Sequence, residues 1–167
     1  MLISDAQTFE FISRSPKQTR RLGARLGALV QGGDVIALEG ELGAGKTLFA
    51  QGLGRGWGAS TRLISPSYVL VRRHERPQDA QKIYHIDLYR LNTLGEIIDL
   101  GLEELFEAVQ SICVVEWANR APDIFPTDHL WVEFHWLDEY RRSLIFRATG
   151  ERHTVLLRKY HKDLIGK

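Results

Sequence analysis

The eight residues from Gly40 to Thr47 constrain the fold of this chain more than any other segment. They read GELGAGKT, with glycines at the first, fourth and sixth positions and a Lys-Thr pair after the last glycine. Gly40 and Gly45 are expected to adopt backbone conformations that are closed to other residues, so that successive N–H groups turn inward on one bound anion. A loop of this kind requires a buried strand before it and a helix after it.

Both flanking elements can be recognised in the sequence. Residues 34–39 (DVIALE) form a short apolar run, as expected for a central parallel strand that is covered on both faces. From Lys46 onward, the spacing of apolar side chains predicts a helix, which we expect the following glycines to end. These glycines are Gly54, Gly56 and Gly58.

We therefore predict that this loop wraps the phosphates of a nucleotide. Lys46 is expected to reach the β and γ phosphates, and the Thr47 hydroxyl to bind Mg²⁺. The unpaired N–H groups and the positive dipole end of the helix would face the same phosphates. The predicted nucleotide-binding residues of the loop are Gly40, Glu41, Leu42, Gly43, Ala44, Gly45, Lys46 and Thr47.

The remaining elements alternate between strands and helices over the first two thirds of the chain. Predicted strands are residues 8–12, 34–39, 68–73, 82–88, 111–115, 130–137, 143–149 and 154–157. Predicted helices are residues 16–30, the helix that begins at 46, and short pieces within 94–109. This order predicts an α/β fold of three layers, with a mostly parallel central sheet and antiparallel edge strands.

Composition limits the classes of protein that remain. Of the 167 residues 44% are hydrophobic, so residues 1–167 are expected to form a single domain with its own core. The formal net charge of +1 provides no broad basic field, and we expect no DNA partner. No stretch approaches the roughly 18 apolar residues of a membrane span. A cytoplasmic protein with no membrane partner is expected.

Cysteine and histidine usage argues against a protein-built metal site. Cys113 is the single cysteine, and its apolar surroundings in residues 112–115 predict a small core residue rather than a nucleophile. The six histidines show no HExxH pattern, and one cysteine cannot build a zinc cage. Metal chemistry is therefore expected to be limited to nucleotide-bound Mg²⁺.

Two acidic residues follow apolar strands and are candidates to complete the site. Glu116 comes after residues 112–115, an arrangement that holds Mg²⁺ or its waters opposite Thr47, although a surface glutamate at a strand end is the alternative. Asp87 closes the strand 82–88 and could position water or contact a Mg²⁺-bound water. The predicted metal residues are Thr47, Glu116 and Asp87, and the predicted catalytic residues are Asp87, Glu116 and Lys46. The sequence does not separate the roles of the two acids.

Basic residues form short groups along the chain. Lys17, Arg21 and Arg25 recur at four-residue spacing on one side of a predicted helix, where a solvated face is the simplest interpretation. The Arg72-Arg73 pair and the basic residues within 158–162 could approach RNA, but short basic clusters are usually solvated surface.

Five motifs in order resemble the TsaE family, the bacterial ATPase subunit that acts in synthesis of threonylcarbamoyladenosine in tRNA. The resemblance covers about residues 15–120. The motifs are EGELGAGKT (39–47), SPSY (65–68), HIDLYRL (85–91), DLGLEE (99–104) and VEW (115–117). The first motif belongs to a very large superfamily, whereas the middle three are much more specific. The family implies the fold of P-loop NTPases.

The resemblance implies roles that composition could not assign. Thr47 and Glu116 resemble the family's Mg²⁺ site, and Asp87 resembles its acid required for turnover. Trp117 resembles the tryptophan beside the nucleotide, although packing of an aromatic ring at a strand end is the alternative. Thr19 resembles a position near the bound base.

Other positions either resemble a mobile family element or depart from the family pattern. Residues 65–68 resemble a switch near the γ-phosphate. Leu48 stands where the family often has a second threonine, which removes one hydroxyl and could change nucleotide affinity. Ala118 replaces the usual proline after VEW and leaves the following turn less constrained.

The family function implied is that of an ATP-binding and ATP-hydrolysing subunit, with ATP and Mg²⁺ as cofactors. It would be required for modification of adenosine 37 of tRNA and would act on assembly and turnover of the TsaB–TsaD complex. The partners implied are TsaB and TsaD, with tRNA reached indirectly through the complex. Arg90 and Arg120 are candidates for an arginine finger, which a partner could also supply. We therefore expect slow hydrolysis by the isolated protein.

Two other functions remain open at this point. A small-metabolite kinase would need an acceptor pocket and a lid bearing arginines, for which Arg141-Arg142 is the only late pair. A nucleotide-gated binding module would use ATP for assembly, and its hydrolysis would be incidental. The phosphate loop is compatible with both.

Overall fold

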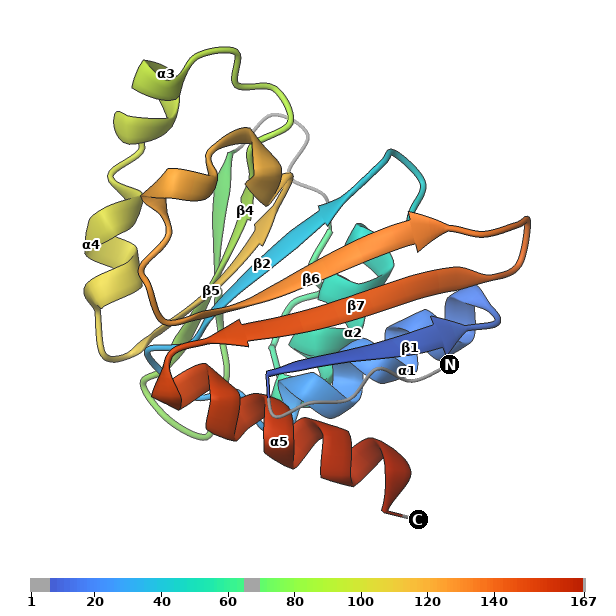
Figure 1. Ribbon diagram of the computed structural model, residues 1–167. Coiled ribbons are helices and arrows are strands. Elements are labelled where there is room, and N and C mark those ends of the chain that lie inside the picture. Colours follow the sequence, from blue (N-terminus) through green and yellow to red (C-terminus); the bar gives the residue numbers. More distant parts are fainter. Residues whose placement is uncertain (1–6, 65–69, 167) are drawn as a thin grey trace.

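The computed structural model describes residues 7–64 and 70–166 and contains one seven-stranded sheet flanked by helices (Figure 1). The strands are β1 (Thr8–Ser13), β2 (Val35–Gly40), β3 (Val71–Glu75), β4 (Lys82–Asp87), β5 (Ser111–Glu116), β6 (His129–Trp136) and β7 (Arg142–Thr149). The helices are α1 (Pro16–Gly27), α2 (Lys46–Trp57), α3 (Leu94–Ile98), α4 (Leu102–Glu107) and α5 (Glu151–Ile165), with 3₁₀ turns η1 (Ala118–Arg120) and η2 (Pro122–Ile124).

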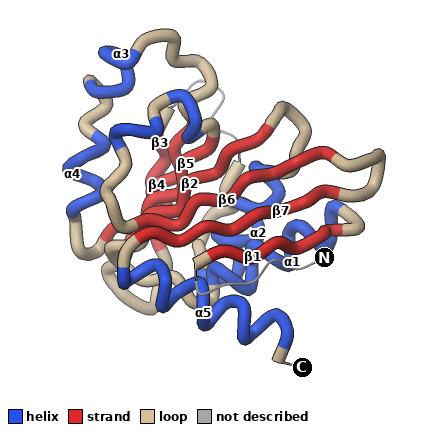
Figure 2. Tube along the Cα trace, viewed as in Figure 1, coloured by secondary structure: helices blue, strands red, loops and turns tan. Residues whose placement is uncertain are grey.

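The sheet has the order β1-β7-β6-β2-β5-β4-β3 (Figure 2). Strands β6, β2, β5 and β4 are parallel to one another. Strand β7 pairs antiparallel with β6, β1 with β7, and β3 with β4. All six residues of β5 are buried, as expected for a strand covered on both faces. The predicted fold class, a mostly parallel central sheet with antiparallel edge strands, is confirmed.

Helices cover both faces of the sheet because alternate residues of each strand point to opposite sides. On one face, side chains such as Ile36 and Val114 pack with residues from α1, α2 and α5. On the other, Val35 and Cys113 pack with residues from α4 and the 3₁₀ turns. Cys113 is thus a core residue, as predicted, and burial raises the pKa of its thiol to about 12.

Helices α1 and α2 pack with their backbones in close contact. A Cβ atom on Gly23 would lie 2.1 Å from the Phe49 carbonyl oxygen, and one on Gly52 would lie 1.9 Å from the Arg20 carbonyl oxygen. Gly56 makes a similar approach to α1. The space between these helices therefore admits no side chain at several positions, which fixes how α2 lies against α1.

Of the three glycines predicted to end α2, only Gly58 does so. The helix runs through Gly54 and Gly56 to Trp57, and Gly58 caps it with a φ of 97°. A Cβ atom on Gly54 would overlap the Leu63 side chain. These two glycines permit close packing, and only Gly58 provides the left-handed conformation of a helix end. Helix α1 also ends earlier than predicted, at Gly27.

The predicted strand at residues 154–157 was also wrong, because this segment lies within α5. His153, Leu156, Leu157 and Tyr160 are buried at helical spacing. The Tyr160 hydroxyl donates to the Leu22 carbonyl oxygen at 2.8 Å, which anchors α5 to α1. A run of three apolar residues does not distinguish a strand from one turn of a buried helix stripe.

A buried histidine joins the start of α5 to the sheet. His153 Nε2 accepts the Val35 N–H at 2.9 Å, and Nδ1 lies 2.6 Å from Asp128 Oδ1. Both ring nitrogens of the neutral imidazole therefore take part in hydrogen bonds. Burial lowers the pKa of His153, against the opposing effect of its hydrogen bond to Asp128.

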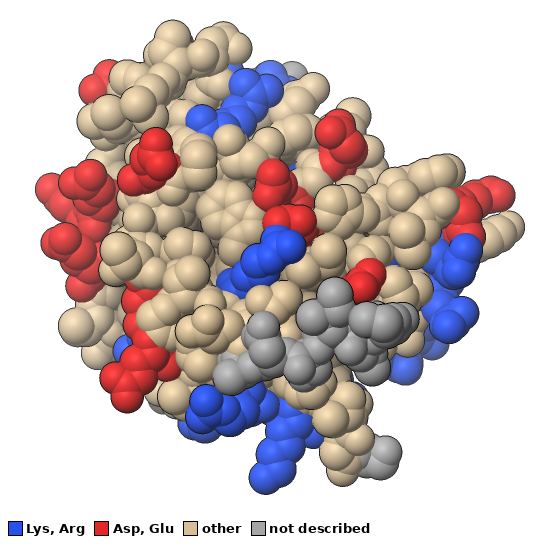
Figure 3. Space-filling model, viewed as in Figure 1, with Lys and Arg blue, Asp and Glu red and all other residues tan. Residues whose placement is uncertain are grey.

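Charged side chains gather mainly on the outer surfaces of helices. Glu103, Glu104 and Glu107 of α4 are exposed, and acidic side chains collect on that side in Figure 3. Lys17 and Arg21 are exposed as predicted, while Arg25 pairs with Asp163 at 2.7 Å. Among the described residues, no helix has the length and apolar character needed to cross a bilayer.

The close helix contact leads to a stability prediction at Gly52. Substitution Gly52→Ala should destabilise the protein by about 1–3 kcal/mol, since overpacking outweighs the gain of about 0.5–1 kcal/mol that alanine brings to a helix interior. The free energy of unfolding in urea measures this change. Gly95→Ala is the matched control, because the nearest atom to its added Cβ lies 3.9 Å away. Equal stabilisation by both substitutions would contradict the packing argument.

Candidate functional site

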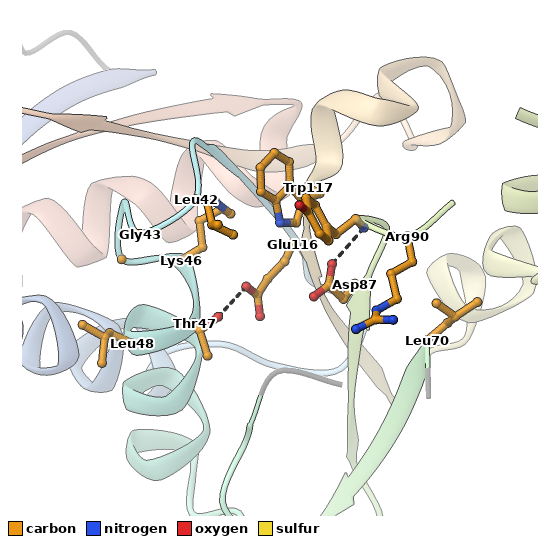
Figure 4. A pocket seen from close by; sticks show the side chains of 12 residues that line it. Leu42, Gly43, Lys46, Thr47, Leu48, Leu70, Asp87, Arg90, Glu116 and Trp117 are labelled. Atoms are coloured by element: carbon orange, nitrogen blue, oxygen red, sulfur yellow. Dashed lines mark hydrogen bonds between the residues drawn. The ribbon is translucent and has the colours of Figure 1, made fainter. Parts of the chain in front are cut away.

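The GxxxxGKT loop leaves the carboxyl end of β2 and leads into α2 (Figure 4). Gly45 caps the helix with a φ of 106°, and Gly43 has a φ of 79°. Gly40 does not adopt a positive φ, contrary to the expectation that it needs a special conformation. A Cβ there would lie 2.8 Å from the Phe134 carbonyl oxygen, so close approach of β6 explains the glycine.

Lys46 lies inside the loop and is only 4% exposed. Its Nζ donates to the Gly40 carbonyl oxygen and, at 2.9 Å, to that of Glu41. It also lies 4.2 Å from the centre of the Trp117 ring. Burial lowers the pKa of Lys46, and the negative charges of Glu116, Asp87 and Glu41 oppose that effect. The desolvated ammonium group of Lys46 is therefore held inside the loop.

The two predicted acids lie beside the loop at the ends of neighbouring strands. Thr47 Oγ1 donates to Glu116 Oε1 at 2.8 Å, although the two residues are 69 positions apart in the sequence. Asp87 pairs with Glu116 in the register of β4 and β5. Its Oδ1 accepts the Tyr89 N–H at 2.9 Å, which orients the carboxylate at the start of the following turn (Figure 4).

These residues border a cavity of about 350 Å³. Its lining comprises Leu42, Gly43, Gly45, Lys46, Thr47, Leu48, Leu70, Asp87, Tyr89, Arg90, Glu116 and Trp117. The structure thus brings together the predicted catalytic and metal residues, Lys46, Thr47, Asp87 and Glu116, with the predicted Trp117. Gly40, Glu41 and Ala44 belong to the same loop without lining the cavity.

Thr19, predicted to lie near the bound base, does not line the cavity. Thr19 is buried behind the loop: its Cγ2 lies 3.4 Å from where a Cβ on Gly45 would lie, and its hydroxyl is 2.7 Å from that of Ser13. Contact of Thr19 with a base stays a prediction. The predicted switch at residues 65–68 lies outside the described residues.

Sequence reasoning missed Leu70 and Tyr89 as lining residues. Tyr89 lies within the HIDLYRL motif, two residues after Asp87, and that proximity was an available signal. The sequence gives no comparable signal for Leu70, because the position of Leu70 at the cavity depends on how β3 pairs with β4. Arg90, considered only as an arginine finger, also lines the cavity.

Trp117 has an unusual backbone conformation at this site. Its φ of 58° is the only positive value for a non-glycine among the described residues. Such strain persists only where surrounding contacts impose it, and it is concentrated at functional sites. The ring contacts Tyr89 with centroids 4.8 Å apart. Arg120 lies near both rings and donates to the Leu91 carbonyl oxygen at 3.0 Å, so its guanidinium supports this wall of the cavity.

Two acids that precede the loop in the sequence have other partners. Asp34 accepts a hydrogen bond from Arg152 at 2.6 Å, and Glu39 accepts one from Trp131 at 2.8 Å. Glu39 borders a separate cavity of about 550 Å³ beside β6. The Asp34 and Glu39 carboxylates are therefore engaged by other side chains.

The oxygen atoms at the cavity suit a hard divalent cation. A hydroxyl on Thr47 and a carboxylate on Glu116 lie in contact, with a second carboxylate on Asp87, and Mg²⁺ prefers such oxygen ligands. Within 7–64 and 70–166, no three His, Cys, Asp or Glu side chains cluster closely enough to hold a metal by themselves. A cation here would therefore need phosphate oxygens or water to complete its coordination.

The fold and site define a mixed α/β protein in which a GxxxxGKT loop and two strand-end carboxylates meet at one edge of a parallel sheet. The model of the family described as "Threonylcarbamoyl adenosine biosynthesis protein TsaE" matches residues 13–144. The chain belongs to the TsaE family and is a protein of tRNA threonylcarbamoyladenosine biosynthesis. The predicted family is thus confirmed, and the match extends beyond residue 120.

Individual relatives give the same assignment. The chain is 33% identical over 142 residues to the tRNA threonylcarbamoyladenosine biosynthesis protein TsaE of Bacillus subtilis, covering 85% of this chain and 87% of the relative. It is 39% identical over 130 residues to the Nostoc protein of the same name, covering 76% and 78%. The crystal structure of Bacillus subtilis YdiB superposes with a TM-score of 0.75 at 24% identity, covers 98% and 97% of the two chains, and supports the fold.

Proposed function

We propose that the protein binds and hydrolyses ATP with Mg²⁺, and that this activity drives assembly and turnover of a TsaB–TsaD complex that modifies adenosine 37 of tRNA. The observation that carries the proposal is the contact between Thr47 and Glu116 beside the buried Lys46. It joins a phosphate-loop hydroxyl to a strand-end carboxylate, the pair needed on either side of a nucleotide-bound cation.

Phosphate binding would use groups that the loop already presents. The N–H groups that begin α2 have no partner within the helix, and the positive end of the helix dipole lies at the same place. Lys46 would exchange the carbonyl oxygens of Gly40 and Glu41 for phosphate oxygens. Because Lys46 is already desolvated, its charge would act strongly on a bound phosphate.

Mg²⁺, when bound, would supply positive charge that offsets the charge of the phosphates. Thr47 and Glu116 would hold it directly or through its waters. Glu116 accepts the Thr47 hydroxyl, whereas Asp87 lies one strand further along the sheet. We therefore assign Glu116 to the cation and Asp87 to orientation of the attacking water for in-line displacement.

Two arginines close to the cavity are candidates to stabilise the transition state. Arg120 donates to a backbone carbonyl oxygen and lies against aromatic rings, so its guanidinium is already committed to the cavity wall. Arg90 lines the cavity and remains the candidate within this chain. A partner such as TsaB or TsaD could supply the missing charge, and tRNA would be reached through the complex.

The contacts of Arg141 and Arg142 weaken the case for a small-metabolite kinase. Arg141 pairs with Asp138 at 2.7 Å, and Arg142 donates to the Asp138 carbonyl oxygen at 2.6 Å. Arg141 therefore supports the β6–β7 turn. Arg142 supports the same turn and also donates to the Gly43 carbonyl oxygen of the GxxxxGKT loop at 3.4 Å, so both guanidinium groups already have partners in this structure. A nucleotide-gated binding module is the remaining alternative, and it differs from the proposal in needing no hydrolysis.

Removal of the loop cation should weaken nucleotide binding. Lys46→Ala deletes a charge-assisted contact with phosphate, a loss of about 1.5–3 kcal/mol or roughly 10–150-fold in affinity. Calorimetric titration with a non-hydrolysable ATP analogue and Mg²⁺ measures this affinity. Lys17→Ala, which removes an exposed lysine from α1, is the matched control and should bind as the wild type does. Equal affinities for all three proteins would contradict the assignment of the loop.

Removal of the Asp87 charge should separate hydrolysis from binding. Asp87→Asn preserves the shape of the side chain and should lower the ATP hydrolysis rate by roughly 100-fold or more, with little effect on affinity for the analogue. Threonylcarbamoyladenosine in tRNA from cells that carry only this variant then distinguishes the two functions. Loss of the modification supports a requirement for hydrolysis, whereas normal modification supports gating by nucleotide binding alone.

Hydrolysis should depend on the partner subunits. The steady-state ATPase rate of the isolated protein should be low and should rise when TsaB and TsaD are added together, because a partner completes the charge stabilisation of the transition state. The Asp87→Asn protein with both subunits controls for contaminating ATPases. A wild-type rate that is unchanged by the two subunits would argue against this coupling.

A further inference from the structure

We propose that His85 is a positioning residue that holds the Glu116 carboxylate in the orientation needed to bind Mg²⁺ together with Thr47. This inference rests on the proposed function, since it concerns the same cation site. His85 does not line the cavity and would not touch the nucleotide. It would act through Glu116, from the side of the carboxylate that faces away from the loop.

The geometry places His85 directly behind the cation-binding carboxylate. His85 is fully buried, and its Nε2 lies 2.5 Å from Glu116 Oε2. In the parallel pairing of β4 and β5, His85 lies opposite Val114, so Glu116 is its diagonal neighbour two residues further along β5. Both side chains project to the sheet face that α2 covers, because each is an even number of positions from core residues of that face.

The two oxygens of Glu116 are held from opposite sides. Thr47 donates to Oε1 at 2.8 Å, and His85 engages Oε2. An ionised carboxylate only accepts hydrogen bonds, so His85 presents an N–H at Nε2. When the Thr47 hydroxyl turns to a cation, its bond to Oε1 changes. The bond from His85 remains and keeps the carboxylate from rotating away.

The His85 imidazole makes no other hydrogen bond in the described part of the chain. His85 Nδ1 is buried and has no hydrogen-bond partner there. His153 provides the contrast of a histidine with a structural role, since both of its nitrogens join elements of the fold. An apolar side chain at position 85 would avoid burying an unpaired nitrogen. The single bond to Glu116 is therefore what the imidazole contributes.

Loss of this bond should weaken cation binding selectively. Partners that orient metal ligands typically change metal affinity by about 10–100-fold when they are removed. His85→Leu should raise the Mg²⁺ concentration for half-maximal binding of a non-hydrolysable ATP analogue by that factor. Affinity for the analogue without Mg²⁺ should change little. His85→Gln can place an amide N–H near the position of Nε2 and should restore most of the Mg²⁺ dependence.

His74 offers a matched control on the adjacent strand. It is also buried, has one nitrogen without a partner among the described residues, and bonds Thr61 through Nδ1 at 2.8 Å instead of bonding a carboxylate. His74→Leu should therefore lower the free energy of unfolding without changing the Mg²⁺ dependence. If His85→Leu does not fold, His85→Asn replaces it, because its shorter amide cannot reach Glu116 as Gln does.

The outcomes separate this inference from the proposed function. If wild-type analogue binding does not depend on Mg²⁺, the proposed cation site itself fails. If the wild type depends on Mg²⁺ and the His85→Leu or His85→Asn protein shows the same dependence, only the positioning role fails. A selective loss that His85→Gln restores, with His74→Leu unchanged, supports the positioning role.

Discussion

The hydrogen bond between Thr47 and Glu116 is the interaction on which the site depends. It joins the first turn of α2 to the end of the most deeply buried strand, and so places the GxxxxGKT loop on the carboxyl edge of the sheet. Since β5 lies between β2 and β4, the same position brings Asp87 beside Glu116. A helix N-terminus, a buried lysine and two carboxylates thereby share one cavity.

The position of α2 is itself fixed by glycines that have no contact with the cavity. Gly23 and Gly52 allow α1 and α2 to approach until backbone atoms touch. Bulkier side chains would separate the helices, and because α2 starts at Lys46, a shift of its axis would move Lys46 and Thr47 relative to the sheet. The sequence of α1, which does not line the cavity, therefore contributes to the geometry of the loop.

Sequence patterns predicted features that depend on nearby residues and missed those that depend on distant contacts. The loop, the apolar strand before Glu116 and the parallel centre of the sheet follow from local spacing and strand order. Gly58 caps α2 as predicted, but Gly54 and Gly56 were wrongly expected to end it. They allow close packing against Leu63 and α1, which helix propensity does not describe. Residues 154–157 were wrongly predicted as a strand because a short apolar run fits the periodicity of a strand and that of a helix.

The charges at the site explain why nucleotide and cation should bind together. Lys46 is one buried cation, whereas Glu116, Asp87 and Glu41 all act on it as negative charges. The triphosphate of the proposed ATP would add further negative charge beside Glu116 and Asp87, and one lysine and a helix dipole cannot offset all of it. A divalent cation between the carboxylates and the phosphates would reverse that repulsion. The two acids would then favour binding of the cation-bound nucleotide over the free nucleotide. Nucleotide binding at the loop would therefore depend on the orientation of Glu116.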